Sequence, residues 1–178
     1  ATDFGVGSEI LCINGIYEDV GNIPAAVSNS AELANISIGQ GDVMVTPLQI
    51  ADMLCTICND GVRNQLKLVR GIVNSKGKCM ETKTTELGKV ISKTTARRLQ
   101  NMMKLAVESG TGINAQIYCG AAGKTGSAET GWKKNGKIIK QGWFAGYFPV
   151  DDPQYVCVVI AEDGVSGSES ACPVFQII

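Results

Sequence analysis

The sequence contains no histidine among its 178 residues. Serine and cysteine nucleophiles are commonly activated by histidine, and histidine is the commonest metal ligand. Its absence excludes Ser-His-Asp and Cys-His catalysis within this chain, together with most histidine-based metal sites. A nucleophile here would need a lysine or a carboxylate as its base.

A strong net charge and long apolar runs are also missing. The net charge is −1, which gives no reason to expect binding of nucleic acid. The longest apolar run, residues 155–161, is far too short to span a bilayer. Hydrophobic residues make up 44% of the chain, enough for one domain with a real core. The chain starts at Ala1 without Met and shows no signal peptide, so we expect it to be a piece of something longer.

The cysteines form no disulfide framework, because their number is odd and their spacing irregular. The seven are Cys12, Cys55, Cys58, Cys79, Cys119, Cys157 and Cys172. We expect mostly reduced thiols, with Cys157 in the core. Cys55 and Cys58 have the spacing of a zinc-binding pair, but no second pair or histidine accompanies them. The preferred interpretation is that both fill apolar positions on a buried helix. We expect no metal and no cofactor.

Local signals predict loops first and then a buried helix. Residues 1–45 begin with a stretch rich in glycine, asparagine and serine, expected to form loops with a few short elements. Thr46 as N-cap and Pro47 at the first helical position start a helix that ends at residues 59–61. This helix is apolar nearly all round and should be central. Residues 66–90 are predicted to form a hairpin that turns at residues 74–77.

The rest of the chain predicts a second helix and a sheet. Apolar residues recur at helical spacing over residues 92–109, and Gly110 ends the pattern. They are Leu99, Met102, Met103, Ala106 and Val107. Residues 123–130, 140–150 and 154–163 are predicted strands, and their short connections make them antiparallel neighbours. A terminal helix begins near residue 169. The fold class is therefore α/β of the α+β type, an antiparallel sheet flanked by helices.

The candidate site lies at the start of the first strand, in Lys124, Thr125, Gly126 and Ser127. The lysine offers charge to an anion, and the threonine hydroxyl offers the same anion a hydrogen bond. Alternation along a strand puts Lys124 and Gly126 on one face. Glycine lets a ligand backbone approach, and the Ser127 N–H is one potential oxyanion donor. Together they predict binding of an extended peptide with a free carboxylate by strand addition. The alternative is an edge-strand lysine followed by a turn glycine.

Longer segments carry a family resemblance. Lys-Thr-Gly is one of three signatures of penicillin-binding proteins and class A β-lactamases. The segments "IGQGDVMVTPLQIADMLCTICNDG" and "ISKTTARRLQNMMKLAVESGTG" resemble the corresponding parts of class B (monofunctional) penicillin-binding transpeptidases, as do "AAGKTGSAET", "GWFAGYFPVDDPQYVCVVIAE" and the opening "DFGVG". Two places depart from the family pattern. Ser127 stands where threonine is usual, and "SGSESACP" replaces a frequent Gly-Gly.

The resemblance implies the penicillin-binding transpeptidase and serine β-lactamase-like fold, truncated on its N-terminal side. Residues 1–178 would be the C-terminal portion of one transpeptidase domain. Residues 1–45 form its lead-in, 46–110 its helical part with the hairpin, and 119–178 its strands and the start of a terminal helix. The family needs a Ser-x-x-Lys nucleophile and a Ser-x-Asn motif. No Ser-x-Asn is present, and the one Ser-x-x-Lys, Ser75–Lys78, lies in a predicted turn and is rejected. We expect the nucleophile N-terminal to Ala1, and the isolated chain to be inactive.

The resemblance also implies a function, a peptidoglycan D,D-transpeptidase of cell-wall cross-linking. Lys124 and Thr125 would orient the terminal carboxylate, Gly126 would give clearance, and the Ser127 N–H would stabilise the oxyanion. The partners would be stem peptides ending in D-Ala-D-Ala and β-lactam antibiotics. The location would be the extracytoplasmic face of the bacterial cytoplasmic membrane, with the anchor outside this chain. Alternatives are a β-lactamase or β-lactam sensor of the same fold, or a non-catalytic scaffold. The apolar strand at residues 154–163, left unpaired, would invite self-association.

Overall fold

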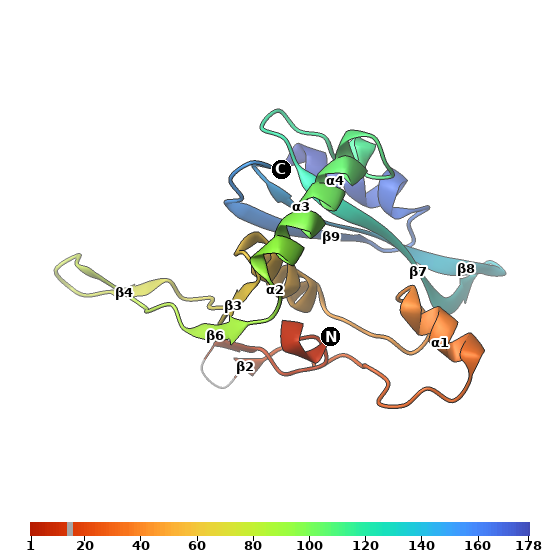
Figure 1. Ribbon diagram of the computed structural model, residues 1–178, viewed down its shortest axis with the longest axis horizontal. Coiled ribbons are helices and arrows are strands. Elements are labelled where there is room, and N and C mark those ends of the chain that lie inside the picture. The colour runs from red at the N-terminus through yellow and green to blue at the C-terminus, as the bar shows by residue number, and fades with distance from the viewer. Residues whose placement is uncertain (14–15) are drawn as a thin grey trace.

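The computed structural model describes residues 1–13 and 16–178 (Figure 1). Its elements, in chain order, are η1 (Thr2–Phe4), β1 (Leu11–Ile13), β2 (Ile16–Tyr17), α1 (Ser30–Ser37), α2 (Pro47–Cys58), β3 (Val62–Asn64), β4 (Gly71–Val73), β5 (Cys79–Glu81), β6 (Glu86–Lys89), α3 (Lys93–Glu108), η2 (Ile113–Ala115), β7 (Ala122–Lys134), β8 (Lys137–Phe148), β9 (Tyr155–Ala161), the π-helical turn η3 (Gly167–Ala171) and α4 (Cys172–Ile177). Across these two described ranges, no helix has the length and apolar character needed to cross a membrane.

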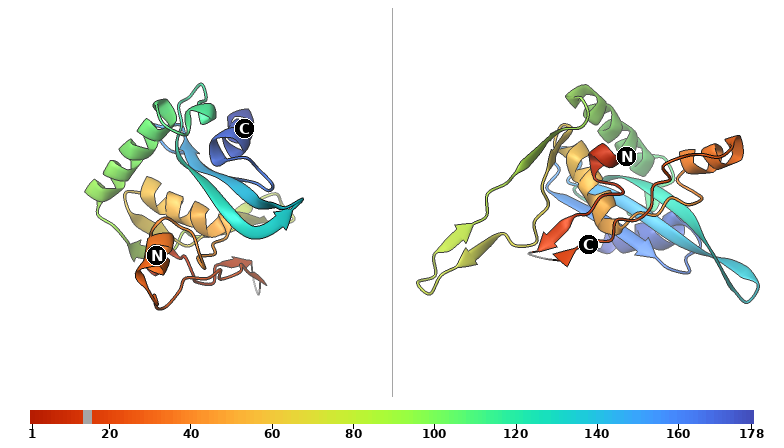
Figure 2. Two further views of the ribbon diagram at one scale, coloured as in Figure 1. Left: turned by 90° about the vertical axis from the view of Figure 1, so that its right-hand side faces the viewer. Right: turned by 90° about the horizontal axis from the view of Figure 1, so that it is seen from below.

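A three-stranded antiparallel sheet organises the C-terminal part, with β8 between β7 and β9. Helices α2 and α3 contact one face of this sheet, and η3 and α4 contact the other (Figure 2). The predicted antiparallel sheet flanked by helices is confirmed. Strands β7 and β8 run further than predicted and turn at Asn135 and Gly136, which both have positive φ. An Asn-Gly pair of this kind suits a tight hairpin whose twist matches its strands.

The core lies between the sheet and α4. The rings of Phe144 on β8 and Phe175 on α4 meet edge to face, with centroids 4.7 Å apart. Val159 and Cys172 are buried in the same cluster. Cys157 packs against it, as predicted for a cysteine in an apolar strand.

Helix α2 begins as predicted. The Thr46 hydroxyl accepts a hydrogen bond from the Gln49 N–H, and the Gln49 side-chain oxygen accepts one from the Thr46 N–H, which completes a capping box. The helix contacts β9, β3 and α3, so it is central. Its buried side chains are not all apolar, because Gln49, Asp52 and Thr56 are buried beside Leu54 and Ile57. Each has a hydrogen-bond partner, which offsets the cost of its burial, although the Oδ1 atom of Asp52 has none among the described residues.

The lead-in contains a helix that the sequence analysis did not predict. Asn29 caps the N-terminus of α1 by accepting from the Glu32 N–H at 3.0 Å, and Glu32 accepts in turn from the Ser28 N–H at 2.7 Å. An Asn-x-x-Glu spacing is a known start signal for helices. The glycine-rich and serine-rich surroundings hid it.

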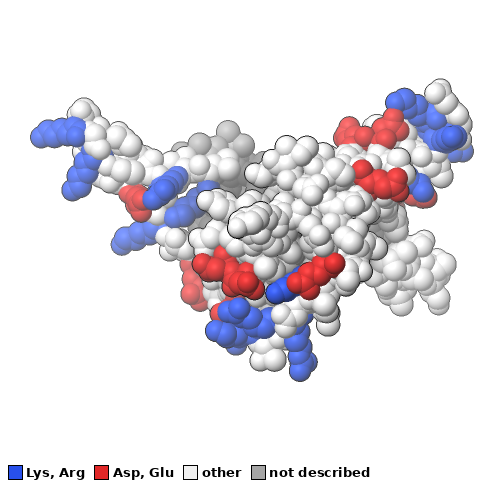
Figure 3. All heavy atoms as spheres, turned by 90° about the horizontal axis from the view of Figure 1, so that it is seen from above, with Lys and Arg blue, Asp and Glu red and all other residues white. Residues whose placement is uncertain are grey.

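The predicted hairpin is present as β4 and β5, with a shorter ladder than expected. Its turn is fixed by Asn74, whose side-chain oxygen accepts from the N–H groups of Lys76 and Lys78. The hairpin projects well away from the sheet (Figures 1 and 2). Lys and Arg gather over it (Figure 3), since residues 65–85 hold five basic residues and one acidic one.

Helix α3 also forms where predicted, with Ser92 accepting from the Thr95 N–H as N-cap. Its buried line is Ala96, Gln100 and Val107. Met102, one of the apolar residues at helical spacing, does not follow this buried line, because its side chain is 64% exposed.

The six cysteines with described side chains are free thiols, and Cys12 lies outside that set. Cys55 and Cys58 are half-buried on α2. Burial raises the pKa of the Cys58 thiol to about 12, so it stays protonated at neutral pH. Within the two described ranges, no group of acidic or cysteine side chains is placed to hold a metal ion.

Candidate active site

The Lys-Thr-Gly segment lies on β7, which is an edge strand of the sheet among the described residues. Its neighbour β8 places Ala145 opposite Lys124 and Trp143 opposite Gly126. The ladder is regular from Ala122 to Glu129. The alternation of backbone groups can therefore be followed along the whole candidate site.

The backbone of β8 shows which residues of β7 face the open edge. The Lys140 carbonyl accepts from the Gly164 N–H at 2.9 Å, on the β9 side of the sheet. Neighbouring residues of an antiparallel strand point their N–H and C=O groups to opposite sides. Even-numbered residues of β8 therefore face β9, and odd-numbered ones such as Trp143 face β7. Gly126, the partner of Trp143, therefore directs its N–H and C=O groups toward β8.

Thr125 and Ser127, one residue to either side of Gly126, consequently direct their N–H and C=O groups to the open edge. An exposed row of backbone groups of this kind can accept an added strand. The Ser127 N–H points outward, as the predicted oxyanion donor would have to.

Lys124 and Gly126 share one face of the sheet, as the alternation predicted. It is the face covered by α3, because Tyr147 on the same face donates its hydroxyl proton to the Gln100 carbonyl of that helix. The exposed Lys124 ammonium folds back over the edge and donates to the Thr125 carbonyl at 2.6 Å. The one cation of the segment therefore sits beside an outward-facing peptide group.

The Thr125 side chain lies on the opposite face, with Phe144. Its hydroxyl oxygen is 2.7 Å from that of Thr111, in the Gly-Thr-Gly loop after α3. A hydroxyl has one proton and two lone pairs. Thr111 can donate to Thr125 and leave the Thr125 proton for a ligand. Thr111 was not among the predicted site residues.

Ser127 is held by two further groups. The Gly167 N–H at the start of η3 donates to its hydroxyl oxygen at 3.3 Å, and the Gln40 amide donates to its carbonyl at 3.1 Å. A Cβ at Gly167 would lie only 2.5 Å from the Gly126 carbonyl oxygen, so η3 packs directly on the segment. Gln40, 87 residues away in sequence, was not predicted as a site residue.

Ser75 and Lys78 are exposed in the turn between β4 and β5. The turn is present where it was predicted, and this location argues against the two residues as a nucleophile pair. The hairpin that carries them points away from β7 in Figure 1 and in the right-hand view of Figure 2.

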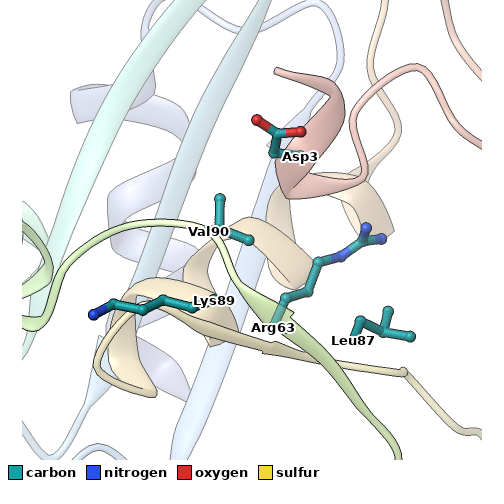
Figure 4. A pocket seen from close by; sticks show the side chains of 6 residues that line it. Asp3, Arg63, Leu87, Lys89 and Val90 are labelled. Carbon is teal, nitrogen blue, oxygen red and sulfur yellow. The ribbon is translucent and has the colours of Figure 1, made fainter.

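A separate pocket of about 190 Å³ lies between η1 and the β3–β6 pair (Figure 4). Its walls are Asp3, Arg63, Leu87, Gly88, Lys89 and Val90. The Arg63 guanidinium is held by Asp52 of α2 at 2.7 Å. Burial raises the pKa of the Asp52 carboxyl, and Arg63 opposes that shift. This pair joins α2 to β3, and the pocket contains no residue of β7.

The sequence matches known proteins along its whole length. The family profile described as "Penicillin binding protein transpeptidase domain" matches residues 1–178. Penicillin-binding protein PbpB of Mycolicibacterium smegmatis is 35% identical over 167 residues, covering 84% of this chain and 26% of that protein. Peptidoglycan D,D-transpeptidase PbpA of the same organism is 30% identical over 154 residues, covering 83% of this chain and 31% of that protein. The chain thus spans only about a quarter to a third of these relatives.

Solved structures match as well. The imipenem acyl-enzyme of penicillin-binding protein A from M. tuberculosis superposes with a TM-score of 0.81 at 27% identity, over 99% of this chain and 39% of that one. The D,D-transpeptidase domain of a peptidoglycan glycosyltransferase from Eggerthella lenta gives 0.74 at 31% identity, over 99% and 44%.

Proposed function

This chain belongs to the penicillin binding protein transpeptidase domain family, and we propose that it supplies the substrate-binding strand of a serine-type peptidoglycan D,D-transpeptidase. The observation that carries the proposal is the open edge of β7. There the Lys124 ammonium and the outward N–H of Ser127 lie along the same stretch of backbone. The names of the relatives support the reaction class.

In the proposed complex, a stem peptide ending in D-Ala-D-Ala adds to β7 as an extended strand. Its terminal carboxylate binds the Lys124 ammonium and the Thr125 hydroxyl, both of which donate. Gly126 presents no side chain to the peptide. The Ser127 N–H binds the carbonyl oxygen of the penultimate D-Ala and stabilises the negative charge that develops on it.

The nucleophile in this scheme is a serine that precedes Ala1 in the whole protein, paired with a lysine one helical turn away as base. The serine oxygen attacks the penultimate D-Ala carbonyl, the terminal D-Ala leaves with a proton, and an acyl-enzyme forms. An amine of a neighbouring stem peptide then attacks this ester and releases the serine. A β-lactam would acylate the same serine.

The remaining assignments follow from the same scheme. Residues 1–45, 46–110 and 119–178 are parts of one transpeptidase domain, which works on the extracytoplasmic face of the cytoplasmic membrane. By itself, the 178-residue chain would be inactive. Strand β9 is the other edge of the sheet among the described residues, and its apolar side chains favour pairing with a second copy of the isolated chain. A monomer in light scattering at high concentration would argue against this pairing.

The test of the function is an exchange assay on the whole protein. We expect it to replace the terminal D-Ala of a stem peptide with labelled D-Ala, and to hold a penicillin adduct for many turnover times. Rapid hydrolysis of penicillin with no exchange would instead identify a β-lactamase.

A further inference from the structure

The Gln40 side chain lies on the same backbone group that a bound peptide needs. Its amide nitrogen donates to the Ser127 carbonyl at 3.1 Å. That carbonyl faces the open edge of β7, together with the N–H of the same residue.

A peptide residue that pairs with Ser127 across this edge would exchange two hydrogen bonds with it. The Ser127 N–H would donate to the peptide carbonyl, and the peptide N–H would donate to the Ser127 carbonyl. If the first bond is the oxyanion contact of the proposed function, both belong to the residue whose carbonyl is attacked. The N–H of that residue and the Gln40 amide then compete for the Ser127 carbonyl oxygen, because two donors on one oxygen weaken each other's hydrogen bonds even though it has two lone pairs.

The backbone of Gln40 is held in place by hydrogen bonds, so a peptide would displace only the Gln40 side chain from the Ser127 carbonyl. Helix α1 ends in a Schellman motif, in which the Gln40 N–H donates to the Asn35 carbonyl at 2.9 Å and the Gly39 N–H to the Ile36 carbonyl at 3.0 Å. Gly39 has the positive φ of 72° that this motif requires. A rotation of side-chain torsions is enough to free Ser127, and no segment has to move.

We propose that Gln40 is a specificity-determining residue of this site: its amide holds the Ser127 carbonyl in the free protein and slows acyl donors that must displace it with an N–H of their own, relative to donors that lack this N–H. A donor without that N–H leaves the Gln40 bond intact. This inference rests on the proposed function, and it assigns a role to a residue outside the Lys-Thr-Gly segment.

Two β-lactams separate the two kinds of donor. Penicillin G carries an acylamino N–H beside its reacting carbonyl, whereas imipenem carries a hydroxyethyl group at that position. The experiment measures the second-order acylation rate of the whole protein with each drug, for the unmodified sequence and for Gln40→Met. Methionine keeps the length of the side chain and removes the donor. Gln154→Met is the matched control, because the Gln154 side chain donates to Asp152 in the turn between β8 and β9, away from β7.

We expect Gln40→Met to raise the penicillin G rate by roughly three- to tenfold, the span of one neutral hydrogen bond, and to leave the imipenem rate and the control unchanged. Gln40→Asn, which keeps the amide but shortens its reach, should act in the same direction and covers the case in which Gln40→Met folds poorly. An equal change with both drugs, or a slower reaction with penicillin G, would overturn the assignment. If neither drug acylates the unmodified protein, the proposed function fails first, and the role of Gln40 with it.

Discussion

The hydroxyl oxygens of Thr111 and Thr125 lie 2.7 Å apart and join the loop after α3 to the Lys-Thr-Gly strand. Thr111 is exposed, so its hydroxyl could bind water and does not need Thr125 as a partner to satisfy its hydrogen bonds. Its consequence is directional: a proton donated by Thr111 leaves the Thr125 proton free to bind a carboxylate. In the proposed function, Thr111 would therefore position the Thr125 hydroxyl for the carboxylate.

A double-mutant cycle tests this coupling. Thr111→Val and Thr125→Val should each lower the penicillin acylation rate of the whole protein by roughly three- to tenfold, as expected for one hydrogen bond. The double variant should be no slower than the slower single variant, since Thr111 has no other route to the ligand. Effects that multiply would show that the two hydroxyls act independently.

The Asp52–Arg63 pair should be structural. Asp52 is 2% exposed, so Arg63→Met leaves a buried carboxylate without its cation. We expect a loss of about 3–5 kcal/mol in the free energy of unfolding by urea. The double variant Asp52→Leu with Arg63→Met should recover most of this loss. A single variant as stable as the parent would contradict the burial of this pair.

The stability of the Arg63→Met variant should depend on pH, and the pKa of Asp52 gives the sign of this dependence. Burial raises the Asp52 pKa, and without Arg63 it would rise further. A raised pKa means that the folded state binds the proton more tightly, so stability is lost as pH increases. The free energy of unfolding of Arg63→Met should fall as pH rises above 3.8, the ordinary value for this group, and a flat profile would count against it.

Thiol reactivity should divide the cysteines by location. Cys79 and Cys119 are exposed, whereas burial raises the pKa of Cys58 to about 12 and that of Cys172 to about 11. Because the thiolate is the reactive form, iodoacetamide at neutral pH should label the first two quickly and the other two only after unfolding. Peptide mapping by mass spectrometry measures this. Fast labelling of Cys172 in the folded chain would contradict its place in the core.

The elements that the sequence revealed are those with local signals. Thr46, Pro47 and Gln49 lie within four residues of one another and define the start of α2. The sheet followed from strand periodicity and short turns. Helix α1 had a cap signal at Asn29 and Glu32 that was masked by its surroundings.

The contacts around the candidate site had no such signal. Gln40 and Ser127 are 87 residues apart in the sequence and meet because the end of α1 lies beside β7 in the fold. A local sequence pattern cannot predict a contact between residues so far apart. Met102 shows a different limit of local pattern. It lies at helical spacing with the other apolar residues of α3, yet no neighbouring element covers its side chain, which is 64% exposed. Local pattern predicted the strand that carries the candidate site, but not the residues Gln40 and Thr111 that contact this strand.

Lys124 should contribute through its charge. Lys124→Ala should lower the penicillin acylation rate of the whole protein by roughly ten- to a hundredfold, as expected for a hydrogen bond to a charged group. Lys133→Ala, an exposed lysine further along β7, is the matched control and should have no effect. Equal acylation rates for the two variants would show that Lys124 does not bind the ligand.

The most direct measurement is the identity of the acylated residue. The whole protein is treated with penicillin, digested, and mapped by mass spectrometry, beside the 178-residue chain treated in the same way. We predict one adduct, on a serine that precedes Ala1, and no adduct on the isolated chain. An adduct on a serine within residues 1–178, such as Ser75, would contradict the assignment of this chain as the substrate-binding part of the enzyme.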